Sequence, residues 1–176
     1  MSDCGGTIRK IEKTRPLKIS FGGCAALGVY HTGVGKCLTD HAPHVLEEFE
    51  QLYGASAGAF AAVCAVCKCD PMVIYEWILE TFRTSREYSF CGMVNPCFGL
   101  YTRLRDFLES ILPRDAHKLC RNRVNISLSV IGSNGLPLRN WLLTDFTTRK
   151  ELVNVSHHII SQRIVLPQAP LNCRQL

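Results

Sequence analysis

The sequence has 176 residues, of which 47% are hydrophobic and 20% are charged, and its formal net charge is +5. This length suits one domain with a buried core, and this composition excludes an intrinsically disordered chain, a fibrous repeat and a coiled coil. The excess positive charge lies in residues 89–176, which hold eleven Lys and Arg against five Asp and Glu. We interpret the excess as a solvated surface that also suits adsorption to anionic lipid. No nucleic-acid partner is expected, because aromatic residues are not interleaved with the basic ones.

The chain divides into a lead, a domain and a tail. Residues 1–16 are charged and hold no apolar segment typical of a signal peptide, so we expect a flexible lead and a cytoplasmic protein. Residues 17–154 form the domain. Residues 155–176 contain no acidic residue and no sustained period, and we interpret them as a divergent tail. The longest apolar run, residues 59–67, is shorter than the roughly 18 residues that span a bilayer.

The sequence of the first part of the domain predicts two successive strand–loop–helix units. Residues 17–21 (LKISF) alternate in hydrophobicity, as strands do, and small residues follow them. In chain order we expect a strand over 17–21, a loop over 22–28, a helix over 29–38, a short helix over 45–49, a strand over 51–53, a Gly-rich turn over 54–58 and an Ala-rich helix over 59–67.

The second part predicts helices and one antiparallel strand pair. Asp70 and Pro71 are typical of a helix start, Pro113 ends the following helix, and Thr148 with Glu151 forms a capping box. In chain order we expect a helix from 70 to about 86, a loop over 89–98, a helix over 100–112, strands over 124–131 and 138–146 joined by a hairpin turn over 132–135, and a last helix after the capping box.

Ten cysteines are present, and in a cytoplasmic chain they are expected to stay reduced. Cys64, Cys67 and Cys69 have a C-x-x-C-x-C spacing. No second Cys or His pair follows at zinc-finger spacing, and the three interrupt an Ala/Val run. We therefore favour packing in the core and expect no metal.

The motif G-x-S-x-G occurs at Gly54, Ser56 and Gly58, between a predicted strand and a predicted helix. This context is typical of a nucleophile elbow, in which small neighbours let a tight turn close and expose the serine. The following helix directs its positive N-terminus at the site. A plain Gly-rich turn is the alternative interpretation.

The loop over residues 22–28 also lies between a strand and a helix, so its backbone N–H groups can bind an anion. A dinucleotide fingerprint requires a middle glycine where Ala25 stands, which makes the match partial. An oxyanion hole for Ser56 explains both the loop and the elbow by a single reaction, acyl transfer. Nucleotide binding remains the alternative.

Two common serine hydrolase plans do not fit this order of elements. An α/β-hydrolase places several strands before its elbow, and a chymotrypsin-like fold is all-β. The runs LKISFGGCAALGVYHTGV and YGASAGAFAAV instead resemble the patatin-like phospholipases, in the branch that contains adipose triglyceride lipase and adiponutrin. Segments at residues 110–117, 125–129 and 146–152 resemble that branch in the same order.

The resemblance implies an α/β/α sandwich of three layers, incomplete at its C-terminal side, with a Ser–Asp dyad and no cofactor. It implies hydrolysis of acyl esters of glycerol or phospholipid at a lipid-droplet or membrane surface, with a protein co-activator as a further partner. By motif, Ser56 is the implied nucleophile. The implied oxyanion loop contains Gly23, Cys24 and Ala25, and Gly28 begins the helix.

The dyad aspartate of the family lies in an Asp-Gly motif, and no aspartate of this chain is followed by glycine. We therefore expect a shortened form whose sheet has an unpaired edge. Asp145 and His31 are the candidate replacement bases. The alternative function is a catalytically incomplete isoform or fragment that binds lipid surfaces or regulates a full-length lipase.

Overall fold

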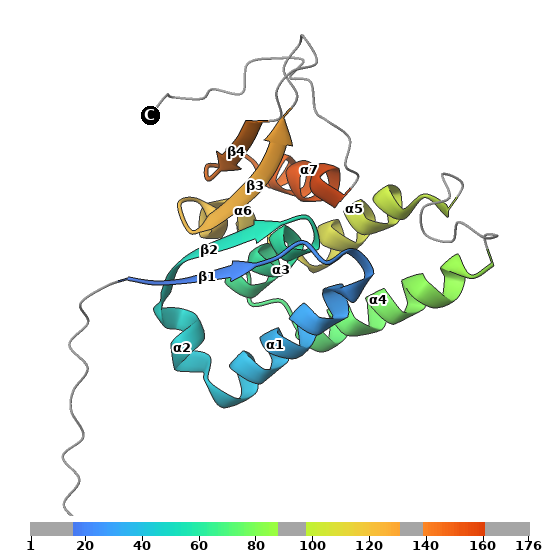
Figure 1. Ribbon diagram of the computed structural model, residues 1–176, viewed down its shortest axis with the longest axis horizontal. Coiled ribbons are helices and arrows are strands. Elements are labelled where there is room, and N and C mark those ends of the chain that lie inside the picture. The colour runs from blue at the N-terminus through green and yellow to red at the C-terminus, as the bar shows by residue number, and fades with distance from the viewer. Residues whose placement is uncertain (1–15, 88–97, 131–138, 161–176) are drawn as a thin grey trace, which may run out of the picture.

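The computed structural model describes residues 16–87, 98–130 and 139–160 (Figure 1). Four strands form one sheet in the order β1-β2-β3-β4, in which β1, β2 and β3 are parallel and β4 is antiparallel to β3. The predicted α/β class is confirmed. The strands are β1 (Leu17–Phe21), β2 (Phe49–Ala55), β3 (Val124–Val130) and β4 (Arg139–Leu143).

Seven α-helices and one short 3₁₀ helix occur in the described ranges, and every helix predicted there is confirmed. The structure adds α6, which is too short to produce a hydrophobic period in the sequence. The helices are η1 (Ala25–Leu27), α1 (Gly28–His41), α2 (Pro43–Glu48), α3 (Ala57–Val66), α4 (Pro71–Ser85), α5 (Leu100–Ile111), α6 (Ala116–Cys120) and α7 (Arg149–Ile160).

Several predicted boundaries are wrong by a few residues. The strand predicted over 51–53 extends to Phe49–Ala55, because β1 and β3 pair with it on both sides. The strand predicted to reach residue 146 ends at Leu143. The helix predicted from residue 59 begins at Ala57, directly after Ser56. The predicted hairpin turn at 132–135, and residues 89–97 of the predicted loop, lie outside the described residues.

The core lies between one face of the sheet and the helices. Phe21, Leu52, Val124 and Ile126 alternate with residues of the other face and are buried. Helix α3 packs on this face through residues that are fully buried, namely Ala59, Ala62 and Val63. The burial of α3 between the sheet and its neighbours explains its continuous apolar sequence. The third layer of the predicted sandwich stays a prediction.

The described cysteines are free thiols, and several pack together at the end of α3. Cys64 is buried in the core, and the sulfur of Cys67 lies 3.8 Å from the sulfur of Cys120. Burial raises the pKa of the Cys64 thiol well above its usual value, so this thiol stays neutral and behaves as a small hydrophobe.

Candidate active site

Ser56 occupies a strained turn between β2 and α3. Its backbone angles are φ 52° and ψ −127°, a region that non-glycine residues rarely adopt. The carbonyl of Ser56 accepts the N–H of Ala59 at 2.9 Å, whereas its side chain makes no capping hydrogen bond. The backbone therefore starts the helix, and the hydroxyl is left for chemistry. The predicted strand–turn–helix context of the motif is present.

The two glycines of the motif lie where backbone segments approach closely. A Cβ atom on Gly54 would lie 2.4 Å from the carbonyl oxygen of Gly58 and 2.5 Å from Ala59 Cα. A Cβ atom on Gly58 would lie 2.1 Å from the carbonyl oxygen of Phe21. The absence of a side chain at Gly54 therefore lets the elbow close on itself, and its absence at Gly58 lets the elbow meet the end of β1.

The loop after β1 lies against Ser56. A Cβ atom on Gly23 would be 3.4 Å from the Cβ of Ser56, and one on Gly28 would be 3.7 Å from the Cβ of Ala57. Ala25 is exposed and has a positive φ of 44°, which marks the sharp turn of the loop. The structure thus brings the predicted oxyanion loop to the predicted nucleophile. The roles of these residues stay predictions.

Cys24 lies in the same loop and is half-buried. Burial raises the pKa of its thiol, so the thiol is protonated at neutral pH. A protonated thiol is a poor nucleophile. Burial thus leaves Cys24 without activation, and the strained turn that presents a hydroxyl belongs to Ser56.

His31 holds the loop from α1. Its Nε2–H donates to the carbonyl oxygen of Gly22 at 2.9 Å, and its ring meets the ring of Phe21 edge-on with centroids 5.4 Å apart. Among the described residues, none hydrogen-bonds to Ser56 Oγ. The sequence suggested His31 as a base, whereas this geometry makes it a positioning residue for the loop.

Replacing His31 is expected to loosen the loop without unfolding the protein. A hydrogen bond of this kind contributes about 1 kcal/mol, so we expect His31→Ala to slow the labelling of Ser56 by a serine-directed fluorophosphonate roughly fivefold. His31→Gln keeps a side-chain N–H donor and is expected to recover part of the rate. Equal labelling rates in all three proteins would contradict the positioning role.

Asp145 lies at the opposite end of the sheet from Ser56, because β4 runs antiparallel to β3, which is parallel to β2 (strands labelled in Figure 1). Ser56 follows the end of β2, whereas Asp145 follows the end of β4, which runs the other way. The N–H of Asn122, just before β3, donates to the Thr144 carbonyl at 3.0 Å, and Asp145 accepts a 2.7 Å hydrogen bond from Arg121 Nε. The alternative in which Asp145 is the base is therefore wrong.

The described ranges contain neither a candidate metal site nor a membrane-spanning helix. In residues 16–87, 98–130 and 139–160, no group of three or more His, Cys, Asp or Glu side chains is placed to hold a metal ion. No helix in these ranges has the length and apolar character needed to cross a membrane.

Comparisons with known proteins agree on one protein family. The family described as "Patatin-like phospholipase" matches residues 19–163. Mouse 1-acylglycerol-3-phosphate O-acyltransferase Pnpla3 is 35% identical over 143 residues, which cover 81% of this chain and 33% of that protein. Human patatin-like phospholipase domain-containing protein 2 is 36% identical over 148 residues, which cover 82% of this chain and 27% of that protein. The chain thus spans about a third or less of the length of these two relatives.

Two further proteins are similar to this chain, one in sequence and one in structure. Human patatin-like phospholipase domain-containing protein 4 is 34% identical over 142 residues, which cover 79% of this chain and 53% of that protein. A chain of the ExoU–SpcU heterodimer from the type III secretion system of Pseudomonas aeruginosa has a TM-score of 0.47 and 14% identity. The match covers 89% of this chain and 38% of that one.

Proposed function

Because the chain belongs to the patatin-like phospholipase family, we propose that it is a serine acyl-ester hydrolase whose nucleophile is Ser56. The observation that carries this proposal is the strained backbone of Ser56, with Gly23 of the preceding loop packed beside it. A strained turn that presents a hydroxyl to a ring of backbone N–H groups is the arrangement that acyl transfer requires.

In the proposed reaction, Ser56 Oγ attacks the carbonyl carbon of the ester. The developing oxyanion accepts hydrogen bonds from backbone N–H groups of the loop and of the first turn of α3, where helix N–H groups have no partner within the helix. The ester C–O bond breaks, and the proton lost from the Ser56 hydroxyl goes to the leaving alcohol. Water then hydrolyses the acyl-enzyme, which releases the fatty acid and restores the hydroxyl. The substrates are acyl esters of glycerol or phospholipid, the class that the family implies.

The surface beside the loop supports a lipid interface as the place of action. Leu27, within the loop, and Tyr30, two residues after it, are 69% and 71% exposed. Such side chains bury apolar area when they contact lipid, and the positive charge of residues 89–176 adds attraction to anionic head groups. We therefore propose that the protein acts at the surface of lipid droplets or membranes.

A second candidate function is lipid binding without hydrolysis. It is favoured by the geometry of Asp145, which pairs with Arg121 at the far end of the sheet, and by a sequence in which no aspartate precedes a glycine. A general base contributes about 10²–10⁴-fold to the rate of such reactions. A Ser56 without a base would therefore react slowly.

The test is labelling of the purified chain with a fluorophosphonate, beside Ser56→Ala. We expect the wild type to be labelled and Ser56→Ala to remain unlabelled, with equal circular dichroism spectra. Labelling of both proteins would contradict Ser56 as the nucleophile. Labelling of neither folded protein would favour the lipid-binding candidate.

A further inference from the structure

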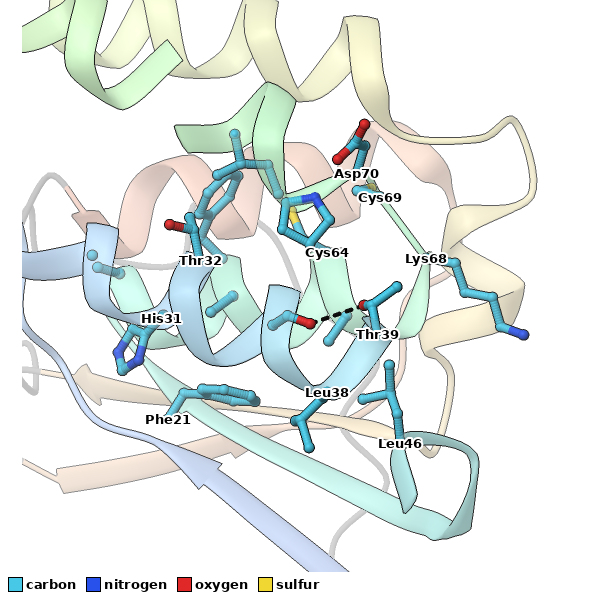
Figure 2. A pocket seen from close by; sticks show the side chains of 18 of the residues that line it. Phe21, His31, Thr32, Leu38, Thr39, Leu46, Cys64, Lys68, Cys69 and Asp70 are labelled. Atoms are coloured by element: carbon cyan, nitrogen blue, oxygen red, sulfur yellow. Dashed lines mark hydrogen bonds between the residues drawn. The ribbon is translucent and has the colours of Figure 1, made fainter. Parts of the chain in front are cut away.

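A cavity of about 420 Å³ lies beside the elbow, between α1 and α3 and next to the first turns of α2 and α4 (Figure 2). One end is lined by Gly28 and Ala57, the residues that directly follow the loop and Ser56. The other end is lined by Lys68 and Glu47, which form an exposed ion pair with an N–O distance of 2.9 Å. The cavity therefore connects the surroundings of the nucleophile with a charged outer end.

Small residues at helical spacing create this space. Helix α1 lines the cavity with Gly28 and Gly35, and α3 lines it with Ala57, Ala61 and Ala65. The two glycines are seven positions apart and the alanines four, so each set lies on one face of its helix, and this face borders the cavity. From residue 28 to residue 39 of α1 the cavity wall is about 16 Å long. The wall thus follows about three turns of α1.

The lining between the two ends presents no charged group that lacks a partner. Apart from His31, which bonds the Gly22 carbonyl, and Asp70, which accepts the N–H of Met72 at the start of α4, its larger side chains are apolar, among them Phe21, Leu38 and Ile74. The two threonines bond their own helix, since Thr32 Oγ1 donates to the Val29 carbonyl at 2.6 Å and Thr39 Oγ1 donates to the Gly35 carbonyl at 2.8 Å. A polar ligand would lose its hydrogen bonds to water here, whereas a hydrocarbon chain would not.

We propose that this cavity holds the long acyl chain of the substrate while Ser56 attacks its carbonyl, an inference that rests on the proposed function. The carbonyl then lies at the end formed by Gly28 and Ala57, and the chain extends along α1 and α3 toward Leu46 and Lys68. The far end limits the length of chain that fits. The chain-length preference of the protein is accordingly set by residues at the far end, such as Ala65, which lies about 14 Å along α3 from Ser56.

The test measures equilibrium binding of radiolabelled octanoate and palmitate to the full chain carrying Ser56→Ala, so the result does not depend on catalysis. Adding Ala65→Leu fills the far half of the cavity. We expect this change to weaken palmitate binding at least about tenfold and octanoate binding less than about threefold, because only the longer chain loses buried methylenes. Val73→Phe, an enlargement on the exposed face of α4 outside the cavity, is the control and is expected to change neither affinity.

Two further variants test the proposal independently of Ala65→Leu. Leu46→Ala enlarges the far end and is expected to raise the affinity for stearate relative to palmitate, even if Ala65→Leu fails to fold. Lys68→Ala is expected to change palmitate binding less than about threefold, since in the proposed orientation the carboxylate lies at the other end. Equal effects of Ala65→Leu on both acids, or a large loss of binding with Lys68→Ala, would overturn the proposal. Absence of labelling at Ser56 together with the expected binding pattern would contradict only hydrolysis.

Discussion

Replacing Gly58 with alanine is expected to prevent stable folding, although alanine is the better helix former. Gly58 lies in the first turn of α3, and an added Cβ would sit 2.1 Å from the carbonyl oxygen of Phe21 and 2.6 Å from that of Gly22. Both atoms belong to the backbone and cannot rotate away. We expect the free energy of unfolding, measured by urea denaturation, to fall by about 4 kcal/mol or more.

Gly33 offers a matched control in α1. A Cβ atom there would meet nothing within 4 Å, so Gly33→Ala is expected to raise the free energy of unfolding by about 0.5–1 kcal/mol. The two variants make the same chemical change in a helix and are expected to act in opposite directions. Comparable stability of both variants would show that β1 and α3 do not approach as closely as described.

Replacing Ser56 with glycine is expected to stabilise the protein, whereas replacing it with alanine is not. The angles φ 52° and ψ −127° are accessible to glycine and strained for any residue with a Cβ atom. Such backbone strain costs about 1–3 kcal/mol, and the freedom that glycine gives the unfolded chain offsets about 0.4–1 kcal/mol of the gain, so we expect Ser56→Gly to raise the free energy of unfolding by about 1 kcal/mol. Ser56→Ala keeps the Cβ and therefore the strain, and is expected to lie within about 0.5 kcal/mol of the wild type.

Chemical denaturation of the three proteins distinguishes strain from an ordinary turn. At an unstrained position, glycine lowers stability because the unfolded chain gains freedom. A Ser56→Gly protein less stable than the wild type would therefore show that Ser56 is relaxed. A Ser56→Gly protein more stable than the wild type would mean that the strained turn lowers the stability of the fold while it exposes the Ser56 hydroxyl.

The sequence alone determined the features that depend on neighbouring residues. The start of α4 is local, because the side chain of Asp70 accepts the N–H of Met72 at 2.8 Å next to Pro71. The start of α7 is local too, since Thr148 Oγ1 accepts the N–H of Glu151 at 3.1 Å. The elbow motif belongs to the same class, because its two glycines and one serine lie within five residues. Such short-range chemistry can be recognised without a fold.

Only the tertiary structure decided which distant residues meet. Asp145 looked available as a base, but the antiparallel direction of β4 places it at the wrong end of the sheet. The contact of His31 with Gly22 and the cavity between α1 and α3 both depend on how two helices pack on one sheet. Sequence periodicity indicates which face of an element is apolar, but it indicates neither the direction of a strand nor the distance between two helices. Those quantities arise when the elements pack, and they decide what surrounds Ser56.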